Sequence, residues 1–152
     1  MLNERQKQIK RLQQNLSSIR KIAGWTAEVL GEKIGVTKQT ISNLENGKTP
    51  MNFSQYIAIR SVLDLEIENN KTNEILPQVV TILLDKGDEL DDENYSKVKV
   101  AADTVAASVA SGIPYETLIP IFGGLIASAV ALLIFDKSIS VNSYRWLKRL
   151  IK

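Results

Sequence analysis

The residue types that carry out most enzyme chemistry are missing from this sequence. Its 152 residues include no His and no Cys, which excludes thiolate nucleophiles, disulfides, Cys/His zinc sites and His-based acid/base catalysis. Hydrogen-bonding chemistry remains, and it is concentrated between Trp25 and Pro50, in WTAEVLGEKIGVTKQTISNLENGKTP. We therefore expect no enzymatic activity, no metal and no cofactor, and we expect function by binding through amide, hydroxyl and ammonium groups.

Short helices with clear start and stop signals are predicted to position this stretch. Apolar residues spaced three and four apart predict a first helix over residues 4–23. Thr26 is placed to cap a second helix, which Gly35 ends, and Thr37 is placed to cap a third, which Gly47 ends. The tight turn between the second and third helices would hold the third out from the body of the protein, as entry into a DNA major groove requires.

A fourth helix is predicted to complete this N-terminal unit. Asn52 followed by Gln55 is typical of a capping pair at a helix N-terminus. The apolar residues expected to be buried on this helix are Phe53, Ile57, Val62 and Leu63.

Four groups of residues mark the stretch from Trp25 to Pro50. They are a Thr that begins the second helix, a Gly-Val-Thr turn, Ile-Ser in the third helix and Glu-Asn-Gly at its end, namely Thr26, Gly35-Val36-Thr37, Ile41-Ser42 and Glu45-Asn46-Gly47. In this combination, residues 16–65 resemble the Cro/C1-type helix-turn-helix family, also called lambda-repressor-like or xenobiotic-response-element type. The resemblance implies a helical domain that binds double-stranded DNA. The residue after the capping Thr, often a Gln in this family, is Ala27 here, so no DNA contact is assigned to it.

The resemblance also implies which side chains would meet DNA. The base-reading set, carried over by position, is Lys38, Gln39, Thr40 and Asn43. Gln and Asn can bond bidentately to adenine, and Lys can donate to the acceptors of guanine. The expected phosphate contacts are Thr26, Thr37, Ser42, Asn46 and Lys48. Long-range attraction, or an arm, would come from a basic group that could equally form a solvated helix face, namely Arg5, Lys7, Lys10 and Arg11.

Charge divides the chain into three segments. Residues 1–65 carry ten Lys and Arg against five Asp and Glu, residues 66–113 carry four against ten, and residues 114–152 carry five against two. We predict an all-α protein, with a helix-turn-helix domain at 1–65, an acidic and then Ala/Ser-rich helical region at 66–113, and an apolar helix with a basic amphipathic tail at 114–152.

The middle segment is predicted to hold two helices. One lies around residues 78–85 and is followed by a turn at Gly87, and the other runs from about Asn94 to Gly112. The acidic run at 85–93 does not fit a calcium-binding EF-hand loop, because the sixth position, where such a loop needs Gly, is Leu90. These acids are better placed as a solvated turn that leads into the next helix.

The segment from Leu118 to Phe135, LIPIFGGLIASAVALLIF, contains no charged residue. As a helix its eighteen residues would extend about 27 Å, enough to cross the hydrocarbon core of a bilayer. Its ladders of small residues, Gly123, Ala127 and Ala131 with Gly124 and Ser128, suit close helix packing in lipid or in protein.

The basic tail after this segment helps to decide whether the segment lies in a lipid bilayer or is buried in protein. Tyr144 and Trp146 are typical of an interfacial anchor. A single span, however, would carry the basic tail outside the cell, against the positive-inside tendency. Burial in a homo-oligomer core is therefore the other interpretation, and both stay open.

Several functions follow from these features. The leading hypothesis is a cytoplasmic, sequence-specific transcriptional regulator, a repressor that acts as a homodimer or higher oligomer through residues 66–152. Its two recognition helices would meet a palindromic operator about 34 Å apart. The alternative is a membrane-tethered or membrane-active small protein, of phage or toxin-antitoxin type, at the inner face of the cytoplasmic membrane, whose helix-turn-helix serves tethering or autoregulation. A third is an assembly protein that uses the helix-turn-helix only for protein contacts.

Overall fold

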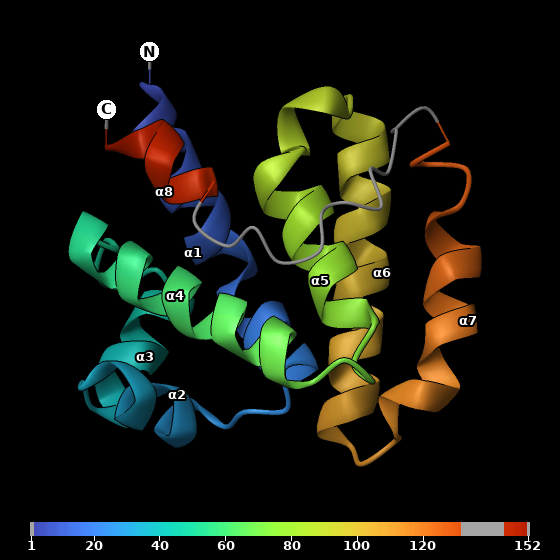
Figure 1. Cartoon of the computed structure of the whole chain (residues 1–152), viewed down its shortest axis with the longest axis horizontal. Coiled ribbons are helices and arrows are strands. Elements are labelled where there is room, and N and C mark those ends of the chain that lie inside the picture. The colour runs from blue at the N-terminus through green and yellow to red at the C-terminus, as the bar shows by residue number, and fades with distance from the viewer. Residues whose placement is uncertain (1, 132–144, 152) are drawn as a thin grey trace.

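The computed structural model describes residues 2–131 and 145–151, and these residues form helices joined by short loops (Figure 1). This confirms the predicted all-α class. In chain order the elements are α1 (Glu4–Ile22), α2 (Ala27–Ile34), α3 (Lys38–Glu45), α4 (Phe53–Asn69), α5 (Ile75–Val79), the π-helix η1 (Val80–Asp85), the 3-10 helix η2 (Gly87–Glu89), α6 (Asp92–Ala110), α7 (Tyr115–Ile126) and α8 (Arg145–Leu150).

Helix α1 is shared by the two halves of the described structure. It packs against α3 and α4 on one side and against α5, η1 and α6 on the other (Figure 1). Its buried residues Leu12, Leu16 and Ile19 therefore contribute to a core that is continuous from α2 to α7. The helices that carry the resemblance are thus supported by the helices that follow them.

The helix starts predicted from capping residues are confirmed. The hydroxyls of Thr26 and Thr37 accept hydrogen bonds from the backbone N–H three residues further on, at 3.1 Å each. Asn52 accepts one from Gln55 N at 2.8 Å, and the Gln55 side chain accepts one from Asn52 N at 2.9 Å. Capping depends on local spacing alone, which is why the sequence predicts it well.

The buried face predicted for α4 is right only in part, because all four residues contact the core but only one of them is fully buried. Leu63 is buried as expected, but Phe53, Ile57 and Val62 are only half-buried. The other residues that are fully buried are Tyr56, Ile59 and Arg60. The helix has apolar residues on several sides, so their spacing does not define which side faces the core. The charged Arg60 can be buried because Asp85 of η1 accepts two hydrogen bonds from it, at 3.0 and 3.2 Å.

The middle segment contains both predicted helices, the first with an earlier start and the second shifted about two residues toward the N-terminus. The first begins at Ile75 as α5 and continues as the π-helix η1 to Asp85. The second, α6, begins at Asp92, after its cap Asp91 accepts a hydrogen bond from Asn94 N at 2.7 Å. Acidic residues thus start this helix, as the sequence indicated. Small residues on its inner face let α6 lie close to α1, namely Val98, Ala101, Ala102, Val105 and Ala106.

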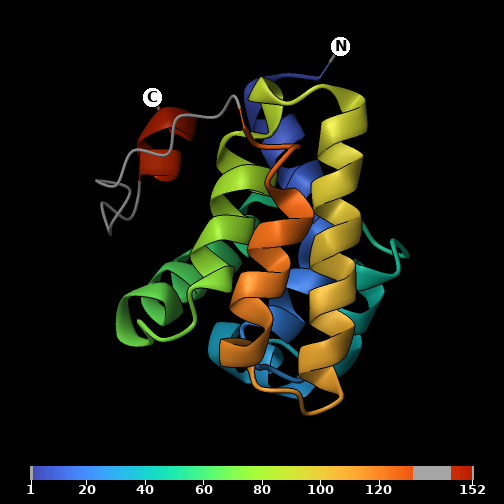
Figure 2. The same ribbon diagram turned by 90° about the vertical axis from the view of Figure 1, so that its right-hand side faces the viewer.

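The apolar helix expected from Leu118 to Phe135 is α7, but within the described residues it ends at Ile126. One face is buried against α6 and α5, through Leu118, Phe122 and Ile126, and Figure 2 shows α7 (orange) alongside α6 (yellow). The exposed side carries Ile121, which is 52% exposed, and Leu125, which is 50% exposed.

The apolar segment from Leu118 to Phe135 does not form a membrane-spanning helix within the described residues. No helix there combines the length and the apolar character that crossing a bilayer requires. The end of the apolar segment, residues 132–135, lies outside the described residues, as do Lys137, Tyr144 and Lys152.

Candidate DNA-binding surface

The turn between α2 and α3 is built by two glycines. Gly35 ends α2 with φ +78°, a left-handed conformation that favours glycine. Gly31, inside α2, lies so close to the turn that a Cβ there would stand 2.7 Å from the carbonyl oxygen of Val36. Gly31 was not among the residues predicted to build the turn, although a glycine inside a short helix is a signal of close backbone approach.

The four predicted base-reading side chains lie on the first two turns of α3. Lys38 and Gln39 are exposed, and Thr40 and Asn43 are half-buried. Gln39 Nε2 donates a hydrogen bond to Asn43 Oδ1 at 2.9 Å, so these two amides lie on the same side of the helix. The hydroxyl of Thr40 lies 3.0 Å from that of Thr37, which ties it to the helix cap. The structure therefore brings Gln39 and Asn43 together and places Thr40 beside the cap.

The predicted phosphate-contacting residues lie at three places. Thr26 and Thr37 cap the N-termini of α2 and α3, where free N–H groups favour an anion. Asn46 and Lys48 are exposed just beyond the end of α3, and Lys48 N donates to Asn43 O at 2.9 Å. Ser42, within α3, is half-buried.

An ion pair that was not predicted from the sequence braces α3 on the side that packs against α1. Arg20 of α1 donates to both carboxylate oxygens of Glu45, at 2.6 and 3.0 Å, and its third hydrogen bond goes to Trp25 O at 2.7 Å. Both side chains of the pair are only 11% exposed. Arg20 thereby joins the end of α1, the end of α3 and the loop before α2.

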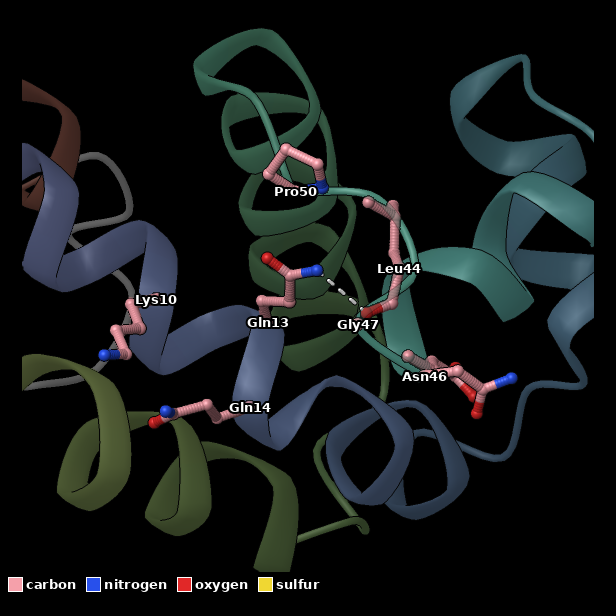
Figure 3. Close-up of a pocket in the computed structure, with 8 residues that line it drawn as sticks. Lys10, Gln13, Gln14, Leu44, Asn46, Gly47 and Pro50 are labelled. Atoms are coloured by element: carbon pink, nitrogen blue, oxygen red, sulfur yellow. Dashed lines mark hydrogen bonds between the residues drawn. The ribbon is translucent and has the colours of Figure 1, made fainter.

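A second brace holds the loop that follows α3. Gln13 donates to Leu44 O at 3.0 Å and to Thr49 O at 2.8 Å, and it accepts from Met51 N at 3.0 Å. A hollow of about 440 Å³ lies beside it, between α1 and this loop. Figure 3 shows Gln13 directed at the loop, with Lys10 and Gln14 on the α1 side of the hollow. The partners of Gln13 are distant in sequence. The residues around Gln13 in the sequence therefore could not predict that it holds this loop.

The basic residues expected to attract DNA have different surroundings. Lys7 and Lys10 are exposed, and the guanidinium of Arg5 stacks 3.9 Å from the centre of the Phe53 ring. Arg11 instead pairs with Asp88 of η2. The hydrogen bond from Arg11 lowers the pKa of the Asp88 carboxyl below its usual value. Arg11 therefore links α1 to η2.

Two short helices across a glycine turn, with a polar and exposed second helix, define a helix-turn-helix of the DNA-binding class. The comparison with protein families agrees, because residues 16–70 match the family described as Helix-turn-helix. Residues 16–70 are therefore a helix-turn-helix domain of the Cro/C1 type. This match supports the function of a DNA-binding transcription regulator. No curated protein and no solved structure matches the chain. Among the residues described, no group of three or more His, Cys, Asp or Glu could hold a metal ion.

Proposed function

We propose that this protein is a sequence-specific transcriptional regulator, a repressor, that reads its operator with α3. The observation that carries this proposal is the pair of amides Gln39 and Asn43 on the outward side of α3, joined at 2.9 Å. The helix behind them is held by the pair Arg20 and Glu45. A rigidly held helix with outward amides is suited to reading bases in a major groove.

The amide pair can present a defined hydrogen-bonding pattern to a base edge. Gln39 Nε2 is directed at Asn43 Oδ1, which leaves Gln39 Oε1 as an acceptor and Asn43 Nδ2 as a donor. Adenine offers the complementary N6 donor and N7 acceptor in the major groove. We therefore expect an A·T pair among the bases that α3 reads. Lys38 would add a contact to guanine acceptors, and Thr40 a contact to a neighbouring base.

Contacts to phosphate would fix the register of α3 without reading sequence. The helix N-termini at Thr26 and Thr37 would meet one stretch of backbone, and Ser42, Asn46 and Lys48 another. Repression then requires only that the bound protein occupies promoter DNA.

A second copy of the chain would supply the second recognition helix of a palindromic operator. We assign this self-association to the segment 66–152, and within it to the outer face of α7. Ile121 and Leu125 are half exposed there. Between them Gly124 has no atom within 4 Å of its Cβ position, so its small size serves no contact made by the described residues.

The experiment that tests the proposal is selection of binding sites from a randomised duplex library with the full chain. The wild-type protein should enrich one palindromic sequence. Gln39→Ala should relax the preference at one or two base pairs by about 1 to 3 kcal/mol. Gln78→Ala, on α5, is the matched control and should select the wild-type site. No enriched sequence, or equal selectivity of wild type and Gln39→Ala, would reject base reading by α3.

A further inference from the structure

The two ends of the chain meet beside the helix-turn-helix domain. The short helix α8 packs against α4 and the beginning of α1 (Figure 1). Trp146 of α8 is 4% exposed, and its ring meets the Tyr56 ring edge to face at 5.6 Å. Its Nε1 donates to Asp64 Oδ2 at 2.7 Å. Burial, ring contact and hydrogen bond together fix α8 on the domain.

One arginine connects α8 to the start of α4. Arg5 Nη2 donates to the carbonyl oxygen of Leu150 at 3.1 Å, and the same guanidinium stacks over Phe53. Phe53 is the first residue of α4 and follows the cap Asn52, which ends the loop after α3. The end of α8 is therefore only one side chain away from the first residue of α4, which follows the loop after α3.

This arrangement collects cations from both ends of the chain. Lys148 and Arg149 of α8 are exposed, and so are Arg5, Lys7 and Lys10 of α1, the helix that α8 contacts through Arg5 and Glu4. We call these five residues the terminal basic surface. Arg149 Nε lies 3.9 Å from Glu4, but both side chains are 42% exposed, so this pairing is weak. Two other carboxylates close by are already bound, Asp64 to Trp146 and Asp88 to Arg11.

The terminal basic surface lies on α8 and on the first part of α1, the helix that also contacts the loop after α3. Gln13 holds the loop after α3, and Arg5 lies eight residues before Gln13 on the same helix. Eight residues of helix extend about 12 Å. With α1 aligned along the duplex, this distance would correspond to about three to four base pairs, because each strand of B-DNA carries one phosphate per 3.4 Å of axis.

We propose that α8 is part of the DNA interface, and that the terminal basic surface binds the phosphate backbone just outside the bases read by α3. This inference rests on the proposed function. It gives the C-terminal helix a role that the helix-turn-helix match at residues 16–70 does not cover. DNA is favoured over an acidic protein because the surface adjoins the loop of the recognition helix, and because α8 is held in place by buried contacts.

The test uses the full-length double variant Lys148→Ser/Arg149→Ser and the operator selected as above, placed within longer flanking DNA. Binding is measured between 50 and 200 mM salt. Each lost phosphate contact reduces the slope of log K against log salt by about 0.9. The double variant should therefore show a slope smaller by about 1 to 2, with unchanged sequence preference. The matched control is Lys71→Ser/Lys97→Ser, which also removes two exposed cations and should keep the wild-type slope.

A second duplex locates the contact. On an operator trimmed to the bases that are read, wild type and Lys148→Ser/Arg149→Ser should bind with the same slope, because the flanking phosphates are gone. The inference is overturned if the double variant keeps the wild-type slope on long DNA, or if its deficit persists on the trimmed duplex. It is also overturned if the substitutions weaken binding to vesicles of anionic lipid but not to DNA. Failure of the proposed function looks different, because the wild-type chain would then select no sequence.

Discussion

At the scale of single residues, the position of α3 depends on side chains that pack behind it. Arg20 makes three hydrogen bonds, and two of them go to Glu45. The pair is nearly buried, so each charge depends on the other for compensation. We therefore expect substitution of Gln39 or Asn43 to leave the fold unchanged, and substitution of Arg20 or Glu45 to destabilise it.

Glu45→Gln should destabilise the protein by about 3 kcal/mol, because it leaves the buried guanidinium of Arg20 without a counter-charge. Urea denaturation measures the free energy of unfolding. The control is Glu93→Gln, whose partner Lys97 lies 3.6 Å away on an exposed part of α6 and whose effect should stay within about 0.5 kcal/mol. Equal effects of the two substitutions would mean that the Arg20 pair is not a structural brace.

At the scale of elements, local signals were predictable and long-range ones were not. Caps such as Thr26 and Thr37 were predicted because the cap and its partner N–H lie three residues apart. The buried face of α4 was predicted only in part, because Arg60 is buried through Asp85, and the two are 25 residues apart. The predicted helix began after Pro77, at residue 78. The observed α5 begins three residues earlier, at Ile75, and includes Pro77.

Thr37→Ala tests whether the cap of α3 contributes to operator binding as well as to stability. Loss of the cap should cost about 1 kcal/mol of stability. It should also weaken operator binding further, because the first turn of α3 carries Lys38 and Gln39. Asp91→Ala removes the corresponding cap of α6, with a similar loss of stability and no loss of affinity once both proteins are fully folded. Thermal unfolding and operator titration separate the two effects, and equal affinities of the two variants would argue against a role for the α3 cap in binding.

At the scale of the whole molecule, the described contacts tie the C-terminal helices to the N-terminal domain. Arg5 and Leu150 are 145 residues apart and yet hydrogen-bonded, and α1 packs on α6 along much of its length. The sequence indicated the basic tail and the charge segments, but nothing in it could bring the tail to α1. The contact between α8 and α1 depends on the packing of Trp146 against Tyr56 and on its hydrogen bond to Asp64. Tyr56 and Asp64 come together only when α4 is folded.

Self-association belongs to the same scale, and it should depend on the outer face of α7. Ile121→Ser/Leu125→Ser removes two half-exposed apolar side chains, which contribute little to the core but would lie at the centre of an interface between two copies. The double variant should sediment as a smaller species than the wild type. It should bind a palindromic operator less tightly, yet bind a single half-site as well as the wild type does.

The matched control is Val100→Ser/Leu65→Ser, because Val100 and Leu65 are also exposed, at 60% and 55%, but lie on α6 and α4. Since α7 and α3 lie on opposite sides of the molecule (Figure 1), two copies joined through α7 hold their recognition helices far apart. The half-sites should then be separated by a multiple of the helical turn of about 34 Å rather than by a single turn. A selected operator with half-sites one turn apart, or a double variant that still sediments and binds like the wild type, would place the interface elsewhere in residues 66–152.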